Sequence, residues 1–383
     1  MAVKTNKKIG NSDYYRIRLD IGFNAQGKRI RKEFYGKTKK EAEQKKQEYL
    51  IGLSTGVAKE KRIGVIMEKW INEVLILKDL KLTSYNKYLD QYNKYFKGSP
   101  IMNYKFNEIK PLVIQEYYNN LLRNGVSSNI IKNINILLRQ FFYYCMVNEY
   151  ISSNPCDNKK IAIPKHEVDK KTKEPFSDEE IKKILNSKEE TNIKYISVIS
   201  LVTGMRKGEV LGLKESDIDF NKKEIHINRT VGTTFSLGEN GKRKKITISQ
   251  TPKTKSSIRS IPLYPSLEQI LKQCIKLRNI RIKENEGKFN LENKSFIFTT
   301  ATGELIESGN ISKSWIYFLK RLNIEHRKFH CLRHTYATIQ FQNNVPLKTV
   351  SNLLGHSNIS TTADIYTHVM KKDKEKSIDI LSL

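Results

Sequence analysis

The sequence predicts a multidomain chain. A small α+β domain, a three-stranded sheet plus one helix, spans residues 1–60, an all-α bundle spans 63–160, and a mixed, mainly helical domain with a small β-sheet spans 172–383. Apolar residues alternate with polar ones near the N-terminus, recur at helical spacing through the middle of the chain, and alternate again between about 218 and 263. A chain of 383 residues is long enough for two or three separate cores.

Two alternating runs, residues 15–21 and 28–35, predict a pair of strands with one apolar and one basic face. The basic face carries Arg16, Arg18, Arg29 and Arg31. A β-ribbon of this width and charge fits the major groove of duplex DNA. A solvated hairpin face is the alternative, and the local pattern favours DNA contact.

A helix follows these strands, because Thr38 and Glu41 have the spacing of a capping box. After a linker at residues 54–62, apolar stripes at helical spacing predict the bundle. The stripes are Val65, Ile66, Trp70, Val74 and Leu77, then Tyr85, Tyr88, Leu89 and Tyr92, then Ile130, Ile134, Leu137, Leu138 and Phe141. Lysines lie among the tyrosines, so phosphate contact is an alternative for these rings, but core packing is favoured.

Three prolines among charged residues, Pro155, Pro164 and Pro175, separate the bundle from the last segment, because proline cannot continue a helix. This segment starts with a second capping box, formed by Ser177 and Glu180. Helical patterns then alternate with the strand patterns at 218–263 and continue to the end of the chain.

The chain is strongly basic, with 69 Lys and Arg against 40 Asp and Glu and a net charge of +29. A polyanion is the natural partner, and nucleic acid is the commonest one. Four scattered cysteines, Cys145, Cys156, Cys274 and Cys331, form no CxxC pair and indicate a reducing compartment. No apolar run is long enough to span a bilayer, so we expect a cytoplasmic protein without a membrane partner.

Motifs that bind nucleotides or metals are missing from the sequence. It contains no GxxxxGK[ST] segment, no GxGxxG after a strand and no HExxH. His330 and His334 are four residues apart, a spacing that zinc sites use, but no carboxylate completes a ligand set. We therefore expect neither a metal nor another cofactor.

One ordered set of side chains can perform chemistry: Arg206, Lys253, His330, Arg333, His356 and Tyr366. Taken singly, each has an ordinary structural interpretation, such as a surface ion pair or a half-buried ring. Together, the cations would neutralise charge on a phosphodiester and make a tyrosine phenol easier to ionise. Glu209 lies one helical turn after Arg206 and can orient its guanidinium. Attack by a tyrosine conserves the phosphodiester energy in an ester, which agrees with the missing nucleotide motif.

Four segments in this order, TGMRKGEVLGL, PKTKSSIRSIPL, HCLRHTYAT and LLGHSNISTTADIYTHV, resemble the catalytic domain of the tyrosine recombinases, the family that includes lambda integrase. The resemblance implies that Arg206 and Arg333 clamp the scissile phosphate, Lys253 is the general acid to the 5′-oxygen, His330 and His356 assist, Glu209 supports the site and Tyr366 forms a 3′-phosphotyrosine. Lys255 is the alternative general acid, and Lys253 is favoured because it lies in the PKT element.

The first two segments are similar to the arm-type and core-binding domains of phage and conjugative-transposon integrases. This resemblance implies double-stranded DNA partners at arm-type and core-type attachment sites. Lys255 and Arg259 are further basic candidates for DNA contact. It also implies a homotetramer on DNA, helped by an apolar C-terminal tail that contains Ile378, Ile380, Leu381 and Leu383. Accessory bending or directionality proteins are a further expected class of partner.

The expected function is that of a site-specific recombinase that integrates and excises a mobile element in the bacterial cytoplasm, associated with the nucleoid when bound to DNA. A type IB topoisomerase-like DNA-relaxing enzyme is an alternative with the same chemistry, but the arm-type domain and the apolar tail argue against it. A non-catalytic DNA-binding protein is a third possibility, against which the complete set of site residues argues. The sequences of the attachment sites, and the choice between phage and conjugative transposon, are open.

Overall fold

The computed structural model describes residues 7–9, 12–23, 29–52, 61–77, 80–157, 160–164, 174–237, 243–252, 255–363 and 365–367. The chain divides into two compact units, residues 1–169 and 170–383. The boundary between them falls inside the proline-containing stretch that the sequence marks as a linker. The first unit contains both the predicted sheet-plus-helix segment and the predicted bundle.

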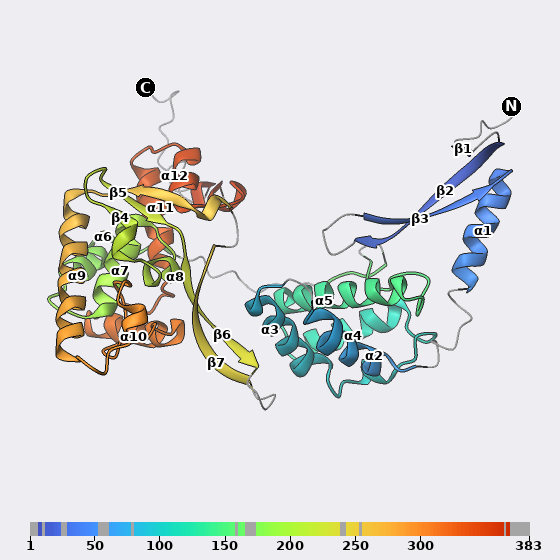
Figure 1. Cartoon of the computed structure of the whole chain (residues 1–383), viewed down its shortest axis with the longest axis horizontal. Helices are drawn as coiled ribbons and strands as arrows, with labels where there is room; N and C mark the ends of the chain where they lie inside the picture. Colours follow the sequence, from blue (N-terminus) through green and yellow to red (C-terminus); the bar gives the residue numbers. More distant parts are fainter. Residues whose placement is uncertain are drawn as a thin grey trace, which may run out of the picture. The chain divides into compact units, whose positions relative to one another are not determined.

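The first unit begins with an antiparallel sheet in the order β1-β2-β3, followed by one helix (Figure 1). Their bounds are β1 Lys7–Ile9, β2 Ser12–Phe23, β3 Arg29–Gly36 and α1 Lys39–Gly52. Helix α1 packs on the apolar face of the sheet, where the rings of Phe34 and Tyr49 lie 5.3 Å apart and Ala42 is buried. The arginines of the paired strands lie on the other face, as the alternation predicts.

The capping box predicted at the start of α1 is half formed. The Thr38 hydroxyl oxygen accepts a hydrogen bond from the Glu41 amide at 3.1 Å, as predicted. The Glu41 carboxylate, however, accepts from the amide of Lys37 at 2.7 Å and not from that of Thr38. Glu41 therefore caps the chain one residue earlier than a standard capping box does.

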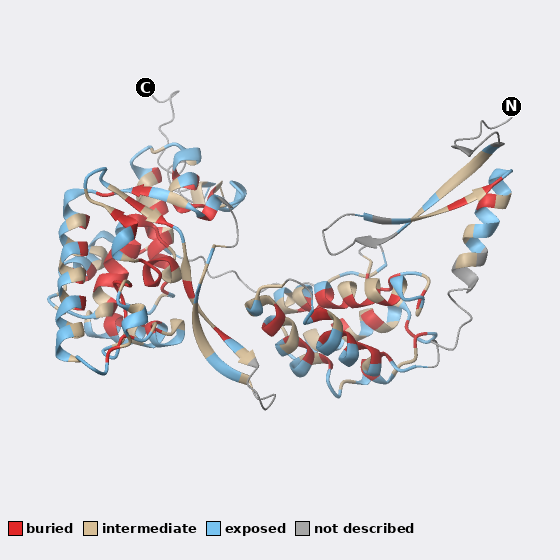
Figure 2. Cartoon of the chain, in the orientation of Figure 1, coloured by how far each residue is buried: buried red, intermediate tan, exposed pale blue. Residues whose placement is uncertain are grey.

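The remainder of the first unit is a helical bundle around its own core (Figure 2). Its helices are α2 Ile63–Lys69, a π-helical turn at Trp70–Leu75, α3 Leu82–Gln91, a second π-helical turn at Tyr92–Phe96, a 3-10 turn at Pro100–Asn103, α4 Pro111–Arg123 and α5 Ser128–Val147. Tyr85 and Tyr92 are 6% and 5% exposed. These two tyrosines are core residues, which confirms the favoured interpretation over phosphate contact.

The sequence pattern wrongly places two residues of the first apolar stripe in the core. Val65 is 63% exposed and Leu77 is 85% exposed, whereas the buried residues of this helix and its continuation are Ile63, Ile66, Met67, Trp70, Ile71 and Leu75. The buried face of this helix passes through Ile63, Ile66 and Met67, so Val65 lies on the solvent side. The π-helical turn then widens the helix and rotates the residues after it, so that Leu77 leaves the core.

The second unit contains helices α6 Asp178–Leu185, α7 Asn192–Thr203, α8 Lys207–Leu211, α9 Pro265–Glu284, α10 Ser308–Arg321, α11 Cys331–Gln342 and α12 Leu347–Leu354. The capping box predicted at the start of α6 is complete, with Ser177 and Glu180 each accepting from the other's backbone amide. Glu180 also accepts two hydrogen bonds from Arg327, at 2.8 and 2.7 Å. The box therefore ties α6 to the segment that precedes α11.

Two small sheets lie between α8 and α9 in the chain. Their strands are β4 Ile218–Asp219, β5 Glu224–Ile227, β6 Thr230–Leu237, β7 Arg243–Gln250 and β8 Arg259–Pro262. Strands β4, β5 and β8 form one antiparallel sheet, and β6 and β7 form a separate two-stranded ribbon. The alternating pattern at 218–263 therefore predicts strands correctly, although it divides between two sheets.

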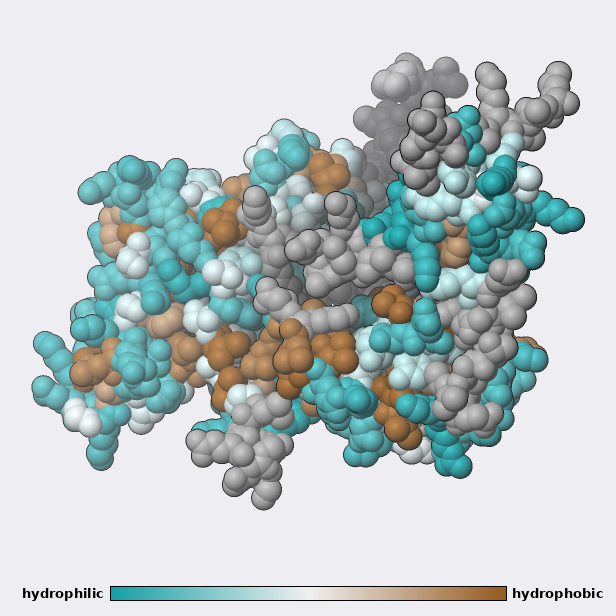
Figure 3. All heavy atoms as spheres, turned by 45° about the vertical axis from the view of Figure 1, so that its right-hand side comes forward, coloured by the Kyte–Doolittle hydropathy of each residue, from teal (hydrophilic) through white to brown (hydrophobic). Residues whose placement is uncertain are grey.

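The second unit has one large apolar core, in which Trp315 is packed against Phe329 with ring centroids 5.3 Å apart, and a smaller separate apolar cluster on α11 and α12. All four cysteines lie among the described residues, are buried and form no disulfide. Hydrophilic residues cover much of the surface in view in Figure 3. Among the described residues, no helix combines the length and the apolar character needed to cross a membrane.

Candidate active site

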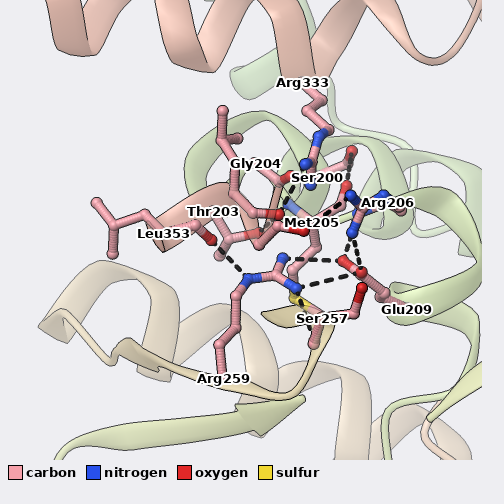
Figure 4. A network of polar contacts seen from close by, with 12 residues as sticks. Ser200, Thr203, Gly204, Met205, Arg206, Glu209, Ser257, Arg259, Arg333 and Leu353 are labelled. Atoms are coloured by element: carbon pink, nitrogen blue, oxygen red, sulfur yellow. Dashed lines mark hydrogen bonds and ion pairs between the residues drawn. The ribbon is translucent and has the colours of Figure 1, made fainter. Parts of the chain in front are cut away.

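The turn between α7 and α8 shapes the site. Gly204 ends α7 in the left-handed region, with φ of 67°, and Met205 is held by hydrogen bonds to Ser200 and Thr203 (Figure 4). A Cβ at Gly204 would lie 2.5 Å from the ring of Tyr336, closer than any real contact. Glycine is therefore required here by both conformation and space.

Arg206 follows this turn and is fixed at three points. Its amide donates to Glu209 Oε2 at 2.8 Å, its Nη1 donates to Glu209 Oε1 at 2.7 Å, and its Nη2 donates to the carbonyl of Gly355 at 3.1 Å. The side chain remains 36% exposed, so part of the guanidinium can still meet a ligand. The sequence prediction that Glu209 orients this guanidinium is confirmed.

The carboxylate of Glu209 is buried, with 4% of its side chain exposed. Burial alone would raise its pKa, but hydrogen bonds from Arg259 and the neighbouring guanidinium charges hold the pKa of Glu209 below its ordinary value. It is therefore an anion at neutral pH. One buried carboxylate thus faces two arginines, and this arrangement leaves the site with an excess of positive charge.

Arg333 lies on α11 and is 2% exposed. Its Nη1 donates to the carbonyl of Gly204 at 2.8 Å, and its Nη2 donates to that of Leu354 at 2.7 Å. Burial and the charge of Arg206 lower the pKa of Arg333 to about 9, which leaves it cationic at neutral pH. The two arginines that the sequence places 127 positions apart, counted from 206 to 333, meet at the same helix end.

Two histidines belong to the same region. His356 follows the end of α12, and its Nδ1 lies 2.7 Å from the hydroxyl of Thr362. Burial, with the charges of Arg333 and Arg206, lowers the pKa of His356 to about 4, so the ring is neutral at pH 7. His330 precedes α11 and is exposed, with its ring centroid 4.9 Å from that of His334.

Tyr366 is partly buried and packs on the small apolar cluster formed by α11 and α12. Its ring meets Phe341 edge to face, with centroids 5.2 Å apart. Lys253 lies outside the described residues, and so does the apolar tail. Lys255 begins a 3-10 turn, Lys255–Ser257. The structure therefore brings Arg206, Glu209, Arg333 and His356 together in one region, and it places Tyr366 on the adjoining cluster.

The prediction that Arg259 contacts DNA needs correction. Its side chain is only 6% exposed, and its guanidinium is bonded to Glu209, to Ser257 O and to Leu353 O. The alternation in β8 gave the signal, because Arg259 has the same parity as the buried Ile261 and Leu263. The parity shows that Arg259 points inward, which the sequence prediction overlooked.

The four arginines predicted on the N-terminal sheet share two carboxylates. Arg16 and Arg18 lie 3.3 and 2.8 Å from Glu33. Arg29 and Arg31 lie 3.5 and 2.9 Å from Asp20. The face therefore holds more positive than negative side chains. Arg16 is partly buried, but Arg18, Arg29 and Arg31 are more exposed, so that an anion can compete for their guanidinium groups.

The described residues contain no group of three or more His, Cys, Asp or Glu side chains that could hold a metal ion. The chemistry that this part of the chain offers comes from guanidinium groups, neutral imidazole, one carboxylate and a phenol. Such a set suits acid–base and nucleophilic chemistry on a charged phosphodiester.

Comparison with known proteins finds similarity over the whole length of the chain. The profile of the phage integrase family matches residues 175–373. A "Tyrosine recombinase XerC-like" protein of Caldanaerobacter subterraneus subsp. tengcongensis is 44% identical over 388 residues, spanning 100% of this chain and 99% of the relative. The ICEBs1 integrase of Bacillus subtilis is 26% identical over 385 residues, spanning 98% of each chain.

Solved structures show the same fold. The integrase of transposon Tn1549, in complex with transposon right end DNA, matches with a TM-score of 0.64 at 20% identity, over 82% of this chain and 99% of that one. A lambda integrase dimer bound to a COC′ core site matches with a TM-score of 0.56 at 17% identity, over 96% and 95%.

The fold and the site thus define a tyrosine recombinase, an enzyme that transfers DNA strands. The chain belongs to the phage integrase family.

Proposed function

We propose that this recombinase is an integrase that inserts and excises a mobile DNA element by cleaving and rejoining duplex DNA through a 3′-phosphotyrosine. The observation that carries the proposal is the anchoring of Arg206 and Arg333 on neighbouring carbonyls at the end of α12, directly before His356. Guanidinium groups fixed in this way are preorganised for the charge that develops on a phosphate, which is the main requirement of phosphoryl transfer.

In this mechanism the Tyr366 phenolate oxygen attacks the scissile phosphorus and displaces the 5′-oxygen of the next nucleotide. Arg206 and Arg333 neutralise the non-bridging oxygens, and Lys253 gives a proton to the leaving 5′-oxygen. His330 and the neutral His356 hydrogen-bond to the phosphate or relay protons. Attack of a 5′-hydroxyl on the phosphotyrosine reverses these steps and releases the tyrosine, so no nucleotide cofactor is consumed.

The domain assignment belongs to the same proposal. Residues 1–60 would form an arm-type DNA-binding domain, residues 63–160 a core-binding domain and residues 172–383 the catalytic domain. The arginine face of the N-terminal sheet supports the first assignment, because its solvent-exposed pairs can exchange carboxylate for phosphate. Solved relatives include a lambda integrase tetramer bound to a Holliday junction, and we extend a tetramer on DNA to this chain.

A nicked suicide substrate that carries the attachment core tests the proposal. The proteins would be incubated with labelled duplex, and covalent protein–DNA adducts would be counted on a denaturing gel. An integrase forms the adduct and, with two partner sites, yields recombinant strands. Relaxation of any supercoiled plasmid at many sequences would indicate a topoisomerase instead. Binding without an adduct would indicate a non-catalytic DNA-binding protein and contradict the proposal.

A further inference from the structure

Three successive carbonyl groups at the end of α12 each accept a hydrogen bond from a different arginine. Arg259 Nε donates to Leu353 O at 2.6 Å, Arg333 Nη2 donates to Leu354 O at 2.7 Å, and Arg206 Nη2 donates to Gly355 O at 3.1 Å. The last carbonyls of a helix lack partners within the helix and carry the negative end of its dipole. This helix end therefore acts as a common anchor for three cations.

Arg259 makes a second, two-pronged contact on its other side. Its Nη1 and Nη2 lie 3.2 and 2.9 Å from the two carboxylate oxygens of Glu209. Glu209 is the same carboxylate that holds Arg206. The side chain of Arg259 is 6% exposed and that of Arg206 is 36% exposed, so Arg259 is the more deeply buried of the two arginines that meet at Glu209 (Figure 4).

The space around Arg259 is tight. A Cβ at Gly355, where φ is +67°, would lie 2.9 Å from Arg259 Nη1 and 2.9 Å from Ser256 O. The guanidinium thus packs directly against the backbone that carries the α12 anchor. Lysine cannot reproduce this contact, because an ammonium group lacks the planar fork that reaches a carboxylate and a carbonyl together.

The charges explain what Arg259 contributes. Both carboxylate oxygens of Glu209 accept a hydrogen bond from the guanidinium of Arg259. Without Arg259, the carboxylate would be neutralised by Arg206 alone, and this pairing would draw the guanidinium of Arg206 inward. With Arg259 present, a single carboxylate is shared between two cations, so that Arg206 keeps positive charge for a ligand.

We infer that Arg259 is a positioning residue for strand cleavage, which acts through Glu209 on Arg206 and through the end of α12 on Arg333. The inference rests on the proposed function, in which Arg206 and Arg333 bind the scissile phosphate. The described hydrogen bonds of Arg259 all run to protein groups, so it acts on the phosphate through other residues and not by direct contact. It orients the guanidinium groups of Arg206 and Arg333, and it leaves Arg206 with positive charge that Glu209 does not neutralise.

The test measures single-turnover adduct formation by the full-length protein on a nicked core substrate. In Arg259→Met, the rate at saturating DNA should fall about 100-fold, the loss typical of a misplaced charge-stabilising donor, while the DNA concentration for half-maximal rate changes little. Adding Glu209→Gln to Arg259→Met should restore the rate at least about tenfold, because the neutral amide no longer draws Arg206 inward. Arg259→Lys is the second variant, because it keeps the positive charge but loses the planar guanidinium. Its rate of adduct formation should be at least about tenfold below that of wild type.

The matched control is Arg278→Met. The Arg278 side chain is also 6% exposed and paired with a carboxylate, but its described bonds run to Glu215 and Asn279. It should lower the midpoint of thermal unfolding without lowering the cleavage rate more than about twofold. If Glu209→Gln adds to the loss in Arg259→Met, or if Arg259→Lys cleaves like wild type, the inference is wrong. If wild-type protein forms no adduct, the proposed function itself fails, and the two failures are thereby distinguished.

Discussion

Arg333 donates a 2.8 Å hydrogen bond to the carbonyl of Gly204, and this bond ties helix α11 to the turn that ends α7. Because a side chain at Gly204 would meet the ring of Tyr336 and the end of Leu354, the position of the carbonyl depends on the absence of a Cβ. The location of a buried cation in the site is therefore set by the conformation of one glycine.

Replacement of Gly204 by alanine should affect both stability and cleavage. We expect Gly204→Ala to lower the free energy of unfolding by more than about 1 kcal/mol, because φ is positive and the added methyl group has no space. Adduct formation should fall as well, since Arg333 loses its aligned carbonyl. Gly287→Ala is the control, with φ of +81° and no atom within 4 Å of the added Cβ. Denaturant unfolding and adduct assays that find equal effects for the two variants would contradict this account.

The planar guanidinium of Arg333 should be needed for the rate of cleavage, and not only for the stability of the fold. Arg333→Lys keeps a cation but cannot reach both Gly204 O and Leu354 O in the same way, so we expect a loss of about 10³-fold in the single-turnover rate. Arg321→Lys is the control, because Arg321 is half exposed and paired with Glu189. A rate for Arg333→Lys within a factor of about three of wild type would show that bidentate anchoring is unimportant.

His356 should make stability depend on pH in a defined direction. Its pKa is about 4 in the folded protein and 6.5 for a free ring, so between these values the unfolded chain binds a proton that the folded chain excludes. The stabilisation from the neutral ring is therefore complete above pH 6.5 and is lost as pH falls towards 4. Thermal unfolding between pH 4 and 7 should show a shallower slope in His356→Gln than in wild type. Identical slopes would mean that His356 titrates normally.

The N-terminal arginine face should control the salt dependence of binding to arm-site DNA. Arg18 is 45% exposed and lies 2.8 Å from Glu33, so a phosphate can replace that carboxylate. Arg18→Gln should lower the slope of log K against log salt by about 1, and deletion of residues 1–60 should remove arm-site binding but leave cleavage of core DNA intact. Lys39→Gln at the start of α1 is the control. If the deletion variant still binds arm-site DNA, residues 1–60 are not the arm-type DNA-binding domain and the proposed domain assignment is wrong.

Local sequence signals predict local structure well in this chain. The capping box of Ser177 and Glu180 is present, and α12 ends at Gly355, which adopts the left-handed conformation that glycine favours. Each depends on residues within one helical turn. The predicted apolar stripe of the first bundle helix is already out of phase at Val65, and it fails again at Leu77. Leu77 follows the π-helical turn at Trp70–Leu75, and such a turn depends on packing that a regular period does not encode.

The order of motifs predicts the residues of the site, but not the contacts between them. Arg206 and Arg333 find their carbonyl partners 149 and 129 residues away, and no local pattern specifies such pairs. The inward direction of Arg259 follows from the alternation in β8, although its basic charge alone suggested DNA contact. The roles of Lys253 and the apolar tail stay predictions.

The most direct test of the central claim compares Tyr366→Phe with Tyr336→Phe on a nicked core substrate. Tyr336 is a buried tyrosine of the same apolar cluster that Tyr366 packs against, which makes it a matched control. Phenylalanine keeps the ring packing of either residue but lacks the nucleophilic oxygen. We predict that Tyr366→Phe binds core DNA and forms no covalent adduct, while Tyr336→Phe forms one. A covalent adduct from Tyr366→Phe would contradict the account.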